Sequence, residues 1–152
     1  MHQLRHKVIP APAADFVLRL VLACILLYAS ADKIIHPQDF ANIVKDYRIL
    51  PESLINLTAL WLPWFELALG VCLYAGVWAE GALALTTGLF AAFWVALIVN
   101  YFRGINVGCG CFTSIPGEAA PMLWYIGRDA LLLALALAAC EMRLHVLGVR
   151  KA

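Results

Sequence analysis

Long apolar stretches separated by short polar segments dominate the chain. There are four of them, at about 14–31, 55–78, 81–102 and 121–140. Each is long enough to cross about 30 Å of hydrocarbon as a helix that rises 1.5 Å per residue. None shows the period-two alternation of a barrel strand. The pattern therefore predicts the all-α class, as an integral membrane four-helix bundle that forms one domain over residues 1–152.

A shorter helix is predicted at about 38–50, between the first and second stretches. Its apolar positions recur at spacings of three and four residues, opposite Lys45 and Asp46. These apolar positions are Phe40, Ile43, Val44 and Tyr47. Pro51 is expected to stop the helix. An amphipathic segment of this kind is typical of the headgroup layer of a membrane.

Composition excludes two classes of protein. Hydrophobic residues make up 64% and charged residues 14% of the chain, against about 45–50% and about 25% in soluble domains. Mean hydropathy is +0.84, which argues against a soluble enzyme and makes membrane lipid the expected surroundings. The net charge is only +1, so no basic surface is available for nucleic acid.

The first stretch resembles a signal peptide, because basic residues precede it and Ala29, Ser30 and Ala31 imitate a cleavage site. Arg19 interrupts the apolar run, and this favours a retained helix. Four spans place both termini on one side, with five basic residues there against four on the other side. The positive-inside rule then predicts an inner (cytoplasmic) membrane protein with cytoplasmic termini and an extracytoplasmic loop at 104–121.

The cysteines fall into two groups. Cys24, Cys72 and Cys140 lie in apolar runs, where a lone cysteine packs as a small hydrophobic residue. Cys109 and Cys111 are separated by one glycine in a polar loop. This spacing suits a strained disulfide that is easily reduced, but also a soft-metal site or an inert structural disulfide.

Ionisable residues inside the spans are the second group of candidates. Glu66 lies near the middle of the second stretch, and Arg128 with Asp129 lies in the fourth. Buried charges need partners, so Glu66 and Arg128 are expected either to pair and lock the bundle or to line a pocket for a quinone headgroup. Lys33 is a further candidate for polarising a quinone oxygen or lowering a thiolate pKa.

Aromatic residues gather at the predicted extracytoplasmic ends of the spans. Most are interpreted as membrane-interface residues, but the indole of Trp124 is four residues from Arg128 and is able to lie against its guanidinium. The aromatic candidates for holding a planar ring are Tyr47, Trp64, Trp124 and Tyr125.

Several segments together resemble the MauE branch of the DoxX-like membrane proteins. The segments are Arg19, the stretch from Asp32 to Phe40, the stretch from Asp46 to Pro51, the stretch from Leu62 to Leu67 with Gly70, and Arg103-Gly104 leading to Cys109-Gly110-Cys111-Phe112. The resemblance covers about 16–140. Thr113 stands where the family commonly has glycine.

The resemblance implies a membrane protein that works with an extracytoplasmic thioredoxin-like partner. The expected architecture is also similar to that of DsbB and vitamin K epoxide reductase, which link disulfides to quinones. We therefore expect a thiol-disulfide oxidoreductase with Cys109 and Cys111 as catalytic residues, a quinone as cofactor and no metal. The alternatives are a soft-metal-handling protein, with His36 as a third ligand, and a reductant conduit through Cys24 and Cys72. A structural subunit without thiol chemistry also stays open.

Overall fold

The computed structural model describes residues 11–105 and 121–150, which form five helices and no strand. They are α1 (Ala11–Ile35), α2 (Pro37–Asp46), α3 (Glu52–Ala75), α4 (Ala79–Phe102) and α5 (Met122–Arg150). All but α2 contain a stretch long and apolar enough to cross a membrane: Ala13–Ile35, Glu52–Ala75, Ala79–Phe102 and Met122–Val146. The predicted all-α membrane four-helix bundle is confirmed, and the chain is a multi-pass membrane protein.

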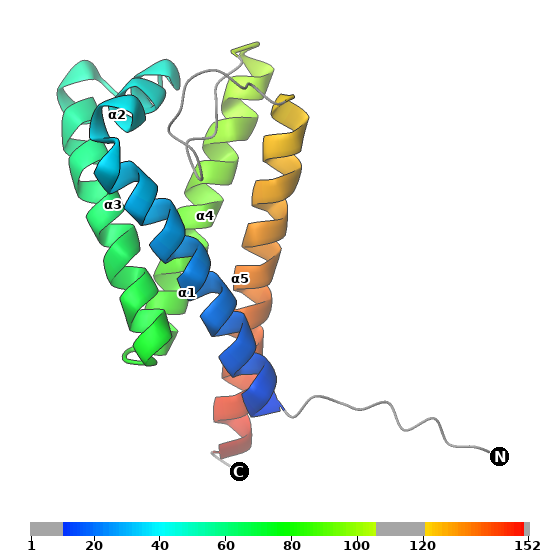
Figure 1. Ribbon diagram of the computed structural model, residues 1–152. Coiled ribbons are helices and arrows are strands. Elements are labelled where there is room, and N and C mark those ends of the chain that lie inside the picture. The colour runs from blue at the N-terminus through cyan, green and yellow to red at the C-terminus, as the bar shows by residue number, and fades with distance from the viewer. Residues whose placement is uncertain (1–10, 106–120, 151–152) are drawn as a thin grey trace.

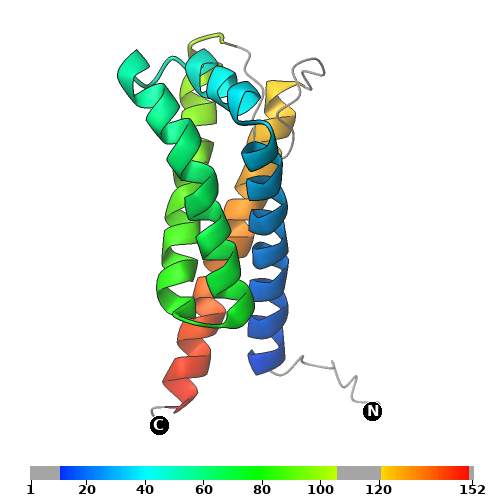
Figure 2. The ribbon, with the colours of Figure 1, turned by 60° about the vertical axis from the view of Figure 1, so that its left-hand side comes forward.

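The four long helices run side by side, and α2 lies across one end of them (Figure 1). We call this the α2 end. At the opposite end lie the start of α1, the connection between α3 and α4, and the end of α5 (Figures 1 and 2). We call this the turn end. Both ends of the described chain therefore share one end of the bundle, as an even number of spans requires.

The bundle is held by close packing of α1 against α3 and α5, and of α4 against α5. Gly70 brings α1 and α3 together, since a Cβ placed there would lie 3.0 Å from the Leu27 side chain. The indole of Trp94 donates a hydrogen bond to the Ile126 carbonyl at 3.2 Å and ties α4 to α5. Large apolar side chains such as Leu60 and Leu131 face outward, as expected in lipid.

Some helix boundaries differ from those predicted. The short helix ends at Asp46 rather than near residue 50, because Arg48 has a positive φ of 48° that no helix continues. The second span ends at Ala75, where Gly76 adopts a left-handed conformation with φ 70°. The last helix continues beyond Cys140 to Arg150, since a helix leaving the membrane needs no apolar side chains.

Candidate functional site

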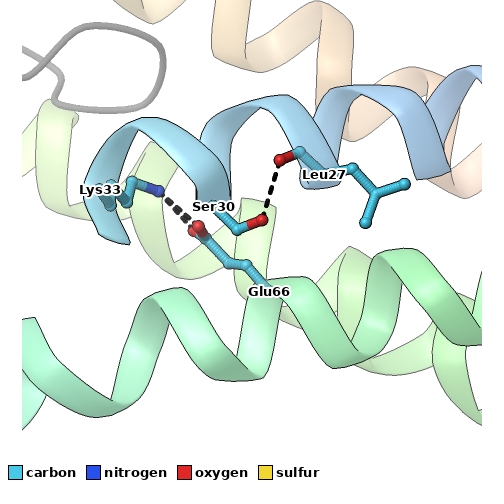
Figure 3. Close-up of polar contacts among 4 residues, drawn as sticks. All are labelled: Leu27, Ser30, Lys33 and Glu66. Atoms are coloured by element: carbon cyan, nitrogen blue, oxygen red, sulfur yellow. Dashed lines mark hydrogen bonds and ion pairs between the residues drawn. The ribbon is translucent and has the colours of Figure 1, made fainter. Parts of the chain in front are cut away.

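A buried ion pair joins α1 to α3. The Lys33 Nζ donates to both carboxylate oxygens of Glu66, each at 2.6 Å (Figure 3). The two side chains are 2% and 3% exposed. One turn before Lys33, the Ser30 hydroxyl donates to the Leu27 carbonyl at 3.0 Å, so it satisfies itself within α1. A charged pair this deep costs several kcal/mol in apolar surroundings unless each charge is matched.

Two phenyl rings cover the Lys33 ammonium. Its Nζ lies 5.1 Å from the centroid of Phe40 in α2 and 5.5 Å from that of Phe93 in α4. Ring faces attract a cation at these distances. Helices α1, α2, α3 and α4 thus all contribute to the surroundings of this one ammonium group, and the amphipathic helix contributes through its predicted apolar face.

The predicted pairing of Glu66 with Arg128 is wrong. Glu66 pairs with Lys33, whereas Arg128 binds the carboxylate of its neighbour Asp129 through Nε at 3.1 Å and Nη2 at 2.9 Å. The ring of Tyr125 lies 5.4 Å from the Arg128 guanidinium. The long Lys33 side chain reaches a carboxylate on the adjacent helix, whereas Arg128 forms its ion pair with a neighbour on its own helix.

The carboxylates of both pairs border one small cavity. This charged cavity, of about 20 Å³, is lined by Lys33, Glu66 and Asp129 among apolar residues of α1, α4 and α5. A space of about 10–15 Å³ is enough for one water molecule. The four-charge cluster, defined as Lys33, Glu66, Arg128 and Asp129, holds two positive and two negative groups and is therefore neutral.

A larger apolar groove lies beside this cluster. It has a volume of about 280 Å³ and is formed by α2, α3, α4 and the segment between α2 and α3. Phe93 lines both the groove and the charged cavity. Phe40 also lines the groove while it covers the Lys33 ammonium. The two rings therefore separate an apolar space from a buried cation.

Tyr47 is the most polar group on the α2 side of the groove. Its side chain is buried, packs with Leu97 and Met122, and lines the groove. Burial raises the pKa of the Tyr47 phenol above its usual range, and the nearby Asp129 carboxylate raises it further. The hydroxyl is consequently neutral and retains its proton near pH 7.

The remaining candidates are spread more widely. Trp64 and Trp124 are 55% and 65% exposed and line neither the groove nor the charged cavity. Cys24, Cys72 and Cys140 are free thiols among the described residues. Cys72 and Cys140 are partly buried, as predicted, whereas Cys24 is exposed on the surface of the bundle. Cys109 and Cys111 lie outside the described residues, so their pairing stays a prediction.

The sequence alone did not assign a role in the site to two residues, Phe93 and Asp129. Phe93 sits in an unbroken apolar run, where nothing separates a ring that covers a cation from one that faces lipid. Asp129 was noticed only as the neighbour of Arg128, although its carboxylate borders the charged cavity. For Asp129 a signal existed, since an ionisable residue within a span is a candidate in its own right.

Comparison with known proteins now identifies the family. The profile of the family described as "Methylamine utilisation protein MauE" matches residues 11–140, which include the first three spans and most of the fourth. The chain belongs to the MauE family. The broader relationship to DoxX-like proteins stays a prediction.

Curated MauE proteins agree with this assignment. The chain is 34% identical to Methylamine utilization protein MauE of Paracoccus denitrificans over 129 residues, covering 84% of this chain and 68% of that protein. It is 35% identical to the MauE of Methylorubrum extorquens over 121 residues, covering 78% of this chain and 64% of that protein. No solved structure matches the chain.

Proposed function

We propose that this MauE-family protein is a membrane thiol-disulfide oxidoreductase that exchanges electrons between an extracytoplasmic thioredoxin-like partner and a membrane quinone. The names of its relatives connect them with methylamine utilisation, and we extend that process to this chain. The observation that carries the proposal is the buried Lys33 ammonium behind the phenyl rings that line the apolar groove. The motif Cys109-Gly110-Cys111 supplies the thiol chemistry.

The groove has the properties that a quinone requires. An isoprenoid quinone combines an apolar ring and tail with carbonyl oxygens that accept hydrogen bonds. The groove is apolar, close in volume to the small end of ligand pockets, and next to Lys33 and the protonated Tyr47 hydroxyl as donors. Rotation of the Phe93 side chain would bring a carbonyl oxygen in the groove within reach of Lys33. Glu66 would then hold the ammonium in place. The Arg128–Asp129 ion pair lies near this position.

The thiol step follows ordinary disulfide exchange. A thiolate of the reduced partner attacks one sulfur of the Cys109–Cys111 disulfide, and the other cysteine leaves as a thiolate. The second thiol of the partner then attacks the mixed disulfide, which leaves the partner oxidised and Cys109 and Cys111 reduced. Reoxidation of this pair releases two electrons and two protons, which convert a quinone to a quinol. Lys33 and Tyr47 bind the carbonyl oxygens in this scheme.

The proposed orientation follows from the same chemistry. We assign the α2 end and the cysteine loop to the extracytoplasmic side of the inner (cytoplasmic) membrane, where disulfides persist, and both termini to the cytoplasm. An impermeant thiol reagent applied to intact, reduced cells should then label Cys109 and Cys111. Labelling only after permeabilisation would overturn this orientation.

The test measures quinone reduction by the protein in phosphatidylcholine vesicles, with reduced thioredoxin as electron donor and decylubiquinone as acceptor. Cys109→Ser and Cys111→Ser should each abolish turnover. The double variant Lys33→Met with Glu66→Gln removes both charges together, and should raise KM for decylubiquinone about tenfold, as expected for the loss of one charge-assisted hydrogen bond. Lys45→Met, on the exposed face of α2, is the matched control and should leave KM unchanged.

The thiol step and the quinone site would be ruled out by different results. Turnover that survives Cys109→Ser would remove thiol chemistry from this pair, and an unchanged KM in a folded Lys33→Met, Glu66→Gln variant would remove the quinone from the groove. Loss of turnover in Cys24→Ser with Cys72→Ser would favour the conduit. Copper(I) that stays bound to the purified protein through mild oxidation would favour the soft-metal alternative.

A further inference from the structure

At the turn end, two arginines share one buried carboxylate. Asp15 Oδ2 lies 3.3 Å from Arg19 Nε and 3.4 Å from Arg143 Nη1, and the Asp15 side chain is 5% exposed. Both distances exceed the roughly 2.7–2.9 Å that is usual for a hydrogen bond between charged groups. The arginine pair, defined as Arg19 and Arg143 with Asp15 between them, carries a net charge of +1.

The hydrogen bonding of the arginine pair is incomplete. Among the described residues, Arg143 Nε is buried with no hydrogen-bond partner, and Arg19 Nε makes its ion contact with Asp15 Oδ2 without completing a hydrogen bond. Asp15 Oδ1 is also buried without a hydrogen-bond partner. A guanidinium carries five N–H donors, and a single carboxylate oxygen that both side chains share satisfies few of them. Glu80 and Glu141 are exposed at the same end, and neither forms an ion pair with these arginines within the described ranges.

The arginine pair lies at the turn end of the bundle, near the limits of two candidate spans. Arg19 Nη1 is so close to Gly76 that a Cβ added there would lie 2.9 Å from it, and Gly76 is the residue at which α3 ends. On α5, the candidate span continues only to Val146, just past Arg143. Figure 2 shows that the last turns of α5 extend beyond the α3–α4 connection. Basic side chains near the ends of spanning helices are able to reach lipid phosphates.

We infer that the arginine pair binds the phosphate of an anionic phospholipid between α1 and α5. Guanidinium groups bind phosphate oxygens with two parallel hydrogen bonds, and the Arg19 and Arg143 side chains are 14% and 25% exposed, so both are accessible from the membrane surface. Asp15 keeps the two cations together against their mutual repulsion. The ring of Phe16, 6.0 Å from the Arg19 guanidinium and 54% exposed, faces the adjoining acyl chains.

The test uses the full chain in vesicles of equal parts phosphatidylglycerol and phosphatidylcholine. Native mass spectrometry after gentle detergent extraction should show retained phosphatidylglycerol on the wild type in excess over phosphatidylcholine. Arg143→Gln should reduce that retention about tenfold. This variant leaves Asp15 paired with Arg19, so it is expected to fold. Lys45→Gln removes one positive charge at the α2 end and should retain as much phosphatidylglycerol as the wild type.

Two further arms identify what the site recognises. Arg143→Lys keeps the charge but loses the planar fork, and should retain an intermediate amount of phosphatidylglycerol. Millimolar inorganic phosphate, added to wild type in pure phosphatidylcholine, should not reproduce the thermal stabilisation that phosphatidylglycerol provides; if it does, the site binds free anions rather than a lipid. Equal retention by wild type and Arg143→Gln, or a retained ratio equal to that of the vesicle, would overturn the inference.

Discussion

The four-charge cluster and the arginine pair both combine basic side chains with carboxylates, but they differ in net charge, contact length and exposure. The four-charge cluster near the α2 end is neutral, and its Lys33–Glu66 pair is short and nearly inaccessible, with both contacts at 2.6 Å. The arginine pair at the turn end has an excess positive charge, contacts longer than 3 Å and partly exposed guanidiniums. Exposure explains the difference, because a charge buried among apolar side chains must be matched by the protein, whereas a partly exposed charge is also matched by water or lipid around the bundle.

Breaking the deeper pair should have the largest effect. Glu66→Gln removes the carboxylate that the buried Lys33 ammonium binds directly and should destabilise the protein by about 3–5 kcal/mol. Replacing both residues with apolar ones, Lys33→Met with Glu66→Leu, should recover most of that loss. Reversible unfolding in detergent measures both variants. A single Glu66→Gln variant as stable as wild type would show that water hydrates the ammonium.

The equivalent change at the turn end should have a smaller effect. Asp15→Asn leaves Arg19 and Arg143 facing each other without a carboxylate, but both guanidiniums reach solvent. We expect a loss of about 1–3 kcal/mol that decreases as salt is added. The same unfolding assay at low and high ionic strength checks this prediction. A loss as large as that of Glu66→Gln, and insensitive to salt, would place Asp15 in the apolar layer.

Tyr47 offers a test that depends on pH. Its raised pKa means that the folded protein retains the phenol proton above pH 10, where the unfolded chain loses it. Its contribution to stability is therefore complete below about pH 10 and falls by about 1.4 kcal/mol per pH unit above it. The difference in unfolding free energy between wild type and Tyr47→Phe should shrink accordingly from pH 9 to pH 11. A constant difference would indicate a phenol that water reaches.

The smallest effect is expected for Arg143→Gln. Arg19 still balances Asp15 in this variant, so unfolding in neutral detergent should change by no more than about 1 kcal/mol. The same substitution is expected to change lipid retention strongly, which separates a role in stability from a role in binding. A loss of several kcal/mol in neutral detergent would make the arginine pair a structural lock like the deeper pair.

The sequence was sufficient to predict the helical architecture, because the apolar pattern of each segment indicates by itself whether the segment spans the membrane or lies at its surface. An unbroken apolar run of about 20 residues has few stable structures other than a spanning helix, and the spacing of Phe40 and Tyr47 defines one face of a short helix whatever lies beneath it. Both side chains are buried in the structure. The helix ends were less predictable, since Arg48 and Trp78 adopt positive φ values that their side chains do not favour.

The pairing of charges was decided by the tertiary structure alone. The sequence shows that Lys33, Glu66, Arg128 and Asp129 each need a partner, but several pairings satisfy the same list of charges. Which carboxylate Lys33 reaches depends on the rotation and tilt of α1 against α3, which follow from packing at contacts such as Gly70 with Leu27. The sequence by itself therefore determined the helices, their membrane setting and the candidate residues. Only the packed bundle determined which charges meet, because an ion pair between helices depends on distances that no single helix specifies.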